Sequence, residues 1–187
     1  MTPSDSSPAA ADSPRARFQI FRAKDAINVD AELMPLVGMT GDDMAGIGAA
    51  IAAGYGDGAT TRLLMADEAT GMSLTYTRFK AGFLLLRHSH DADCAYYVIS
   101  GEAHLGNAVL KAGDSFLVPK GDFYSYQAGP KGVEIIEFRT ATHFHLRFGG
   151  NDPPFWSQIL AATKANAAQW RDAPRTDAEA RLMGERD

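Results

Sequence analysis

Cysteine is nearly absent from this sequence, in which Cys94 is the only one among 187 residues. One thiol cannot form an intrachain disulfide, which excludes a small disulfide-stabilised secreted domain and suits a reducing compartment. Long apolar runs are also missing, since no stretch approaches the roughly 18 residues that span a bilayer as a helix. The first residues, "MTPSDSSPAAADSPRAR", lack the charged-then-apolar order of a signal peptide. We therefore expect a cytoplasmic protein with no membrane partner.

Basic residues are fewer than acidic ones. The chain has 18 Lys and Arg against 23 Asp and Glu, a net charge of -5, and no run of basic residues. Nucleic acid binds positively charged surfaces, so we expect none as a partner. The length and the 45% hydrophobic content are sufficient for one domain with a sizeable core.

Composition divides the chain into three parts. Residues 1–16 are rich in Pro, Ser and Ala and predict a disordered tail. Residues 17–150 predict the main domain, beginning with a short strand over "FQIFRAKDAI". Residues 151–187 predict a C-terminal helix, marked by Pro153–Pro154 and by apolar residues at helical spacing, followed by a charged tail that frays from about residue 171.

Within the main domain, residues 41–55 predict a short helix with Met44, Ile47 and Ile51 on one face. From Thr61 to Phe148 the sequence changes to short runs rich in β-branched, aromatic and leucine residues, separated by glycine-bearing turns. Such runs without helical patterns between them are typical of an all-β sandwich or barrel.

The stretch "RHSHDADCAYYVISGE" is the first candidate site. Alternate residues of a strand share a face, so His88 and His90 point the same way, as do Cys94, Tyr96 and Val98 further along. If these faces line the interior of a barrel, two imidazoles lie in an apolar pocket where a metal could bind.

The spacing of glycines around this pair is more specific. The patterns Gly82-x5-His88-x-His90-x3-Cys94-x6-Gly101 and Gly113-x5-Pro119-x-Gly121-x2-Tyr124 resemble the two motifs of the cupin superfamily, in the order found in small single-domain bacterial cupins. The resemblance covers roughly residues 61–140. It implies a double-stranded β-helix, the cupin jelly-roll barrel, with its pocket inside, and a homodimer. With the segments on either side, we expect this all-β barrel to carry an N-terminal arm and a C-terminal helix.

The sequence departs from the cupin pattern at two of four ligand positions. The family's usual ligands are two histidines, a glutamate and a third histidine, and only His88 and His90 carry over as metal ligands. Cys94 takes the glutamate position and Tyr124 the third-histidine position. A cysteine there partially resembles thiol dioxygenases of the superfamily, which keep the third histidine. The resemblance implies one divalent transition metal; we favour iron, with zinc, nickel and copper as alternatives.

The other pocket residues have open interpretations. Cys94 is either a pocket thiol or a small buried hydrophobe. Tyr124 is either a ligand or a pocket hydroxyl acting as general acid, and we assign Cys94 and Tyr124 as candidate catalytic residues. Tyr96, Tyr126 and Leu86 are candidate pocket-lining residues.

Other polar residues lie on neighbouring predicted strands. A buried arginine facing the pocket would favour a carboxylate substrate, but the sequence does not decide which of these residues face inward: Tyr76, Arg78, Glu137 and Arg139. His143 and His145 share one face of the last strand, which in the family pattern leaves the barrel, so we do not favour them as ligands.

Three functions follow. The first is a metal-dependent enzyme, a non-haem iron-type oxygenase that acts on a small organic molecule. The second is a non-catalytic cupin that binds or senses a small ligand. The third is a metal-free isomerase or epimerase of the sugar-modifying type, with a histidine base and Tyr124 as acid.

Overall fold

The computed structural model describes residues 17–185, so the tail predicted over 1–16 lies outside the described residues. Within the described part of the chain, no helix is long and apolar enough to cross a membrane. The helices and strands, in chain order, are η1 (Ala23–Asp25), β1 (Ile27–Asn28), β2 (Leu36–Val37), α1 (Gly41–Ala52), η2 (Tyr55–Gly58), β3 (Ala59–Asp67), β4 (Met72–Phe79), β5 (His88–Ser89), β6 (Cys94–Leu105), β7 (Ala108–Lys111), β8 (Ser115–Val118), β9 (Gln127–Arg139), β10 (Leu146–Phe148), α2 (Pro153–Asp172) and α3 (Asp177–Leu182).

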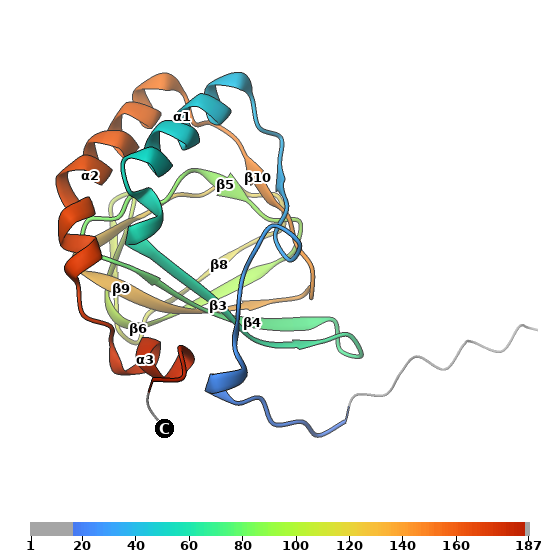
Figure 1. The fold of residues 1–187 in the computed structure, drawn as a ribbon. Coiled ribbons are helices and arrows are strands. Elements are labelled where there is room, and N and C mark those ends of the chain that lie inside the picture. The colour runs from blue at the N-terminus through green and yellow to red at the C-terminus, as the bar shows by residue number, and fades with distance from the viewer. Residues whose placement is uncertain (1–16, 186–187) are drawn as a thin grey trace, which may run out of the picture.

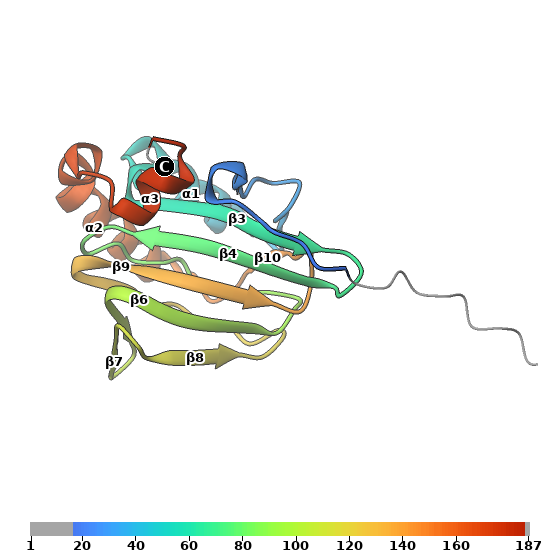
Figure 2. The ribbon, with the colours of Figure 1, turned by 90° about the horizontal axis from the view of Figure 1, so that it is seen from below.

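The strands form two sheets. The larger has the order β1-β3-β4-β9-β6-β7, with β8 also paired to β6, and its strands lie side by side in Figure 2. The smaller has the order β2-β10-β5. Neighbours in the larger sheet are antiparallel, whereas β10 pairs with β2 in parallel. The architecture is a double-stranded β-helix, which confirms the predicted fold class.

The inner face of the larger sheet carries the expected alternation. Along β6, Cys94, Tyr96 and Val98 are buried, while the residues between them are exposed. In the β6–β9 register, Cys94 lies opposite Arg139 and Tyr96 lies opposite Glu137. Because cross-strand partners point to the same face, both charged side chains of β9 enter the barrel interior.

The motif glycines have the backbone conformation that their spacing predicts. Their φ angles are 69° at Gly82, 73° at Gly101, 97° at Gly113 and 86° at Gly121. At Gly101 space is also limiting, since a Cβ atom would lie 2.0 Å from the carbonyl oxygen of Gly132. A residue with a side chain at Gly101 would both strain and displace the β6–β9 ladder.

Helices α1 and α2 pack against each other at one end of the barrel (Figure 1). The two predicted helices are thus confirmed, but the apolar face expected for α1 is wrong. Met44 and Ile51 are 65% and 61% exposed, and only Ile47 packs against the core. The side of α1 that faces α2 instead has Gly46, where a Cβ would lie 2.2 Å from the Trp156 ring, so small residues permit the close approach.

Both ends of the described chain differ from expectation. The strand expected over 18–27 is absent; η1 and the two-residue β1 replace it. The C-terminal segment does not fray at residue 171, because α3 packs on the outside of the larger sheet with Glu179 and Leu182 buried (Figures 1 and 2). Ala178 and Leu182 are one helical turn apart and belong to the same hydrophobic cluster, and Thr176 caps the helix. The segment therefore docks as a short helix and is not the fraying charged tail that we expected.

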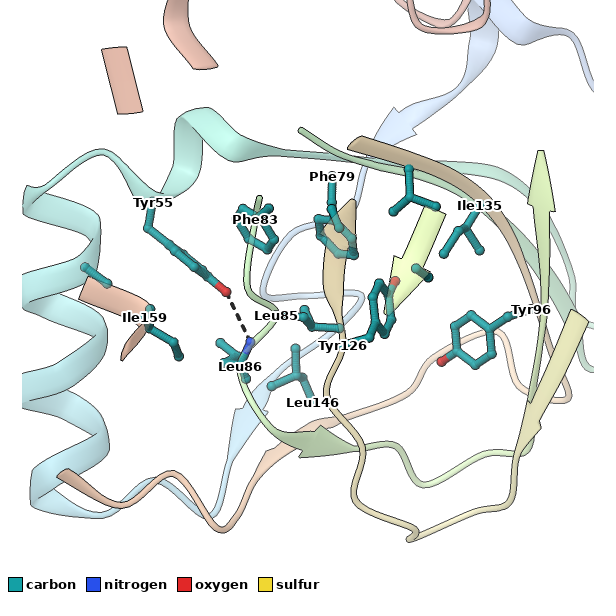
Figure 3. Packing of buried hydrophobic residues seen from close by; sticks show 14 of the residues in the cluster. Tyr55, Phe79, Phe83, Leu85, Leu86, Tyr96, Tyr126, Ile135, Leu146 and Ile159 are labelled. Atoms are coloured by element: carbon teal, nitrogen blue, oxygen red, sulfur yellow. Dashed lines mark hydrogen bonds between the residues drawn. The ribbon is translucent and has the colours of Figure 1, made fainter. Parts of the chain in front are cut away.

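The segment that leads into the two histidines is not a continuous strand. Over residues 83–90, called the histidine arm below, regular pairing is limited to β5 and to isolated bridges at Leu84 and His88. The Tyr55 side chain holds this arm. Its hydroxyl donates to the Leu84 carbonyl at 3.0 Å and accepts from the Leu86 amide at 3.2 Å. Figure 3 shows the second of these hydrogen bonds. The arm is therefore held by a buried side chain where a sheet ladder is missing.

Candidate metal and ligand site

The histidine arm places His88 directly opposite Tyr124. Their backbones exchange two hydrogen bonds, from the His88 amide at 3.1 Å and from the Tyr124 amide at 3.0 Å. The two rings are 4.5 Å apart between centroids. The two sequence motifs, separated along the chain, thus meet at one point inside the barrel.

His88 and His90 face the same side, as their spacing predicts. Their ring centroids are 4.8 Å apart, and both residues are buried. The Nδ1 atom of His88 lies 2.9 Å from the Leu86 carbonyl oxygen, and that of His90 lies 2.7 Å from the His145 carbonyl oxygen. Because a carbonyl can only accept, each Nδ1 carries the proton and each Nε2 presents a lone pair.

The surroundings keep both imidazoles neutral. Burial lowers the pKa of His88 to about 3, and the neighbouring His90 adds to this effect. Burial also lowers the pKa of His90 to about 4, assisted by the positive charge of Arg139. Neutral imidazoles with a fixed Nδ1 proton are the form in which histidine binds metals.

Tyr124 joins the histidines to a second tyrosine. Its hydroxyl lies 2.6 Å from the Tyr96 hydroxyl and 3.4 Å from Nε2 of His90. Burial raises the pKa of both phenols well above the usual value, so both are protonated near neutral pH. Tyr124 is therefore a hydroxyl donor in this structure, and not a phenolate.

These residues open on a cavity of about 170 Å³ inside the barrel. Its apolar wall consists of Met34, Tyr55, Phe79, Leu85, Leu86 and Leu146, and its polar wall consists of Thr61, Thr77, His88, His90, Tyr124, Glu137 and Arg139. Of the predicted site residues, four line this cavity: His88, His90, Tyr124 and Leu86. Tyr96 and Tyr126 are buried in the adjoining core (Figure 3).

Cys94 is placed behind the cavity. It is fully buried at the start of β6, and its Sγ donates to the Ala92 carbonyl at 3.4 Å. Burial raises the pKa of the thiol above its usual value, so the thiol is neutral. A catalytic role for Cys94 stays a prediction that needs a chemical test.

Two charged residues of the cavity wall, Glu137 and Arg139, were candidates that sequence alone could not orient. Arg139 Nη2 pairs with the Glu137 carboxylate, and Arg139 Nη1 donates to Thr75 Oγ1 at 2.7 Å. The guanidinium also lies 4.0 Å from the centroid of the Phe144 ring. The other two candidates, Tyr76 and Arg78, lie on the opposite face of β4 and contact Glu134 and Glu179.

The donor set for a metal is limited to two imidazoles. Among residues 17–185, no three or more His, Cys, Asp or Glu side chains converge to hold a metal ion. The remaining histidines are peripheral: His143 lies 3.8 Å from Glu68, His145 lies 3.5 Å from Asp91 and His104 lies 3.1 Å from Glu102. The donor chemistry still fits a transition metal, because both buried imidazoles line one cavity.

Comparisons with known proteins follow the same motifs. A family model described as the ChrR cupin-like domain matches residues 51–144 of the chain. No curated protein matches it. One similar solved structure is an RmlC-like cupin from Shewanella frigidimarina, 26% identical over 44% of this chain and 76% of that chain, with a TM-score of 0.39.

Two further solved structures are similar over part of the chain. The polyketide cyclase RemF from Streptomyces resistomycificus is 19% identical over 55% of this chain and 84% of its own, with a TM-score of 0.45. The salicylate 1,2-dioxygenase from Pseudoaminobacter salicylatoxidans is 18% identical over 44% of this chain and 25% of its own, with a TM-score of 0.39. None of these likenesses decides a substrate.

Proposed function

This chain belongs to the ChrR cupin-like family, and we propose that it is a metal-binding enzyme of the non-haem iron oxygenase type that acts on a small organic molecule. The observation that carries this proposal is the state of two buried histidines. His88 and His90 each have Nδ1 fixed on a backbone carbonyl, and both side chains line the same cavity. Carbonyl-anchored, neutral imidazoles are typical of metal ligands.

In this proposal His88 and His90 hold the metal through Nε2. A bound ferrous ion would supply redox chemistry with O₂ and polarise the substrate. The carbonyls of Leu86 and His145 fix the ring orientations, so little reorganisation is needed when the metal binds.

Tyr124 would act on the bound substrate as a hydrogen-bond donor. Tyr96 lies behind it at 2.6 Å and can donate to the Tyr124 oxygen, which leaves the Tyr124 proton available to a substrate oxygen in the cavity. The apolar wall excludes water and strengthens these polar interactions. The raised pKa of Tyr124 makes it a hydrogen-bond donor that does not readily lose its proton.

Metal analysis of protein purified without chelator or polyhistidine tag tests the proposal. We expect near-stoichiometric iron or another transition metal in the wild type and its loss in His88→Ala/His90→Ala. The matched control is His104→Ala/His143→Ala, which removes two histidines outside the cavity and should keep the metal. Protein that contains metal is then screened for oxygen uptake with small organic compounds. Absence of metal after anaerobic loading with ferrous iron would contradict the proposal.

A second candidate is a binding or sensing cupin without chemistry, which the two-imidazole donor set favours. Such a protein binds its ligand equally well in the presence of a chelator and converts nothing. The metal-free isomerase is disfavoured, because His90 with a pKa of about 4 is a weak base and Tyr124 with a raised pKa is a weak acid.

A further inference from the structure

Arg139 has hydrogen-bonding capacity that the protein leaves unused. Its side chain is 2% exposed, and a guanidinium has five N–H donors. Thr75 accepts from Nη1 and Glu137 accepts from Nη2, whereas Nε is buried with no hydrogen-bond partner. Arg139 lines the cavity, and because buried polar groups are nearly always paired, its incompletely used guanidinium can donate to a further acceptor there.

The charges around the cavity allow that acceptor to be an anion. Among the side chains of residues 17–185 that line the cavity, Glu137 is the only carboxylate. The other polar groups of the wall are the hydroxyls of threonine and tyrosine, two imidazoles and the Arg139 guanidinium. Glu137 pairs with Arg139 through one oxygen, so the guanidinium is not saturated by a bidentate contact. The carboxylate of a ligand would therefore face one like charge, that of Glu137, together with the N–H donors of Arg139.

The volume and the apolar wall limit the rest of the ligand. An apolar cavity of about 150 Å³ can hold a benzene molecule, and this cavity is about 170 Å³. Phe79, Leu85 and Leu146 offer an apolar surface in the same space. The fitting molecule is therefore about one ring, or a short branched chain, with one polar head.

We propose that the cavity binds a small organic monocarboxylate whose apolar body contacts the leucine and phenylalanine wall and whose carboxylate accepts hydrogen bonds from Arg139. This inference rests on the proposed function only in using the same cavity as the substrate site. The contact with Arg139 itself requires no metal. It narrows the substrate class from small organic molecules to carboxylic acids of about benzoate size.

The test compares matched acids and amides by calorimetry on the full chain. Benzoate, pivalate and 3-methylbutanoate are each paired with the corresponding amide, which has the same shape without the charge. Each pair is titrated into chelator-treated protein and into metal-loaded protein. We expect at least one acid to bind at least about tenfold more tightly than its amide, the range for a hydrogen bond to a charged group.

Two variants connect this preference to Arg139. Replacing Arg139 alone leaves Glu137 as an unpaired buried charge, so the test uses Glu137→Gln/Arg139→Gln, which removes both charges. This double variant should lose the preference for the acid. Glu137→Gln alone should bind the acid more tightly than wild type does, because it removes the like charge and frees an Arg139 donor.

The inference is overturned if no acid is preferred over its amide, or if the double variant keeps the preference. The metal content of the same preparations separates this result from the proposed function. Protein with metal but no acid preference would refute the carboxylate and leave the oxygenase proposal standing. Protein without metal that still shows the Arg139-dependent preference would refute the oxygenase proposal and leave the carboxylate inference standing.

Discussion

Strand β9 carries two buried carboxylates three residues apart, Glu134 on the outer face of the barrel and Glu137 on the inner face. Both carboxylate oxygens of Glu134 accept hydrogen bonds. Its Oε1 accepts from Tyr76 and, at 2.5 Å, from Thr176, and its Oε2 accepts from Ser100 at 2.6 Å. These neutral donors come from the sheet and from the N-cap of α3, so the cluster attaches the C-terminal helix to the barrel.

The inner cluster is built differently. Glu137 pairs with Arg139 and accepts from Thr75 Oγ1 at 3.5 Å. Arg139 lines the cavity, and its Nε has no partner. Both clusters belong to the same strand pair, β4 and β9, and therefore share the same scaffold. In our proposal the fully paired cluster holds α3 in place, whereas the incompletely paired cluster beside the cavity binds a ligand.

The strongest way to break this comparison is Arg139→Gln alone. It leaves the Glu137 carboxylate buried without a counter-charge, so we expect a loss of about 3–5 kcal/mol in the free energy of unfolding. Urea denaturation of Arg139→Gln and of Glu137→Gln/Arg139→Gln measures it, and the double variant should recover most of the loss. If both variants are equally destabilised, the unpaired charge is not the cause.

The corresponding change in the outer cluster is Tyr76→Phe, which keeps the ring and removes one of the donors to Glu134. We expect a loss of about 2 kcal/mol in the free energy of unfolding, because the deleted hydrogen bond is to a charged acceptor. Metal content and affinity for carboxylic acids should match wild type. A change in either would show that the two faces of the sheet are coupled.

The histidine site was predictable from the sequence, whereas the two glutamate clusters were not. The cupin motif placed His88, His90 and Tyr124 together correctly, because strand alternation and turn glycines are local signals. The run "VEIIEF" does not alternate between polar and apolar residues, because β9 is buried on both faces and carries Glu134 on one face and Glu137 on the other. The sequence therefore does not indicate which glutamate points into the barrel. Burial of the outer face depends on α3, a tertiary contact that a charged tail sequence does not predict.

The contribution of Glu134 to the stability of the fold should depend on pH, with a smaller effect than that of Tyr76→Phe. Burial alone would raise the pKa of Glu134, but hydrogen bonds from Ser100, Thr176 and Tyr76 outweigh it and hold the pKa below its usual value. A carboxyl with a lowered folded-state pKa stabilises the fold above its unfolded pKa of about 4.3 and loses this contribution as the pH falls further.

We therefore expect the stability advantage of wild type over Glu134→Gln to be constant above about pH 5 and to shrink below about pH 4. Urea denaturation of both proteins from pH 7 to pH 3.5 measures it. The effect is smaller than that of Tyr76→Phe because burial and hydrogen bonding oppose each other in the shift. An advantage that grows on acidification would show that the carboxylate is not stabilised by its donors.

The smallest expected effect concerns Cys94, which lies opposite Arg139 at the edge of the inner cluster. Its thiol is fully buried and its pKa is raised by burial, so little thiolate forms at neutral pH. We expect the native protein to react with Ellman's reagent only as fast as it unfolds, and Cys94→Ala to lose about 1 kcal/mol of stability, an ordinary value for a buried truncation. In our proposal Arg139 binds carboxylic acids, so we expect their affinity not to change. Rapid reaction of the native thiol, or loss of carboxylic-acid binding in Cys94→Ala at full metal content, would instead place Cys94 within the ligand site. The inner cluster would then consist of Cys94, Glu137 and Arg139.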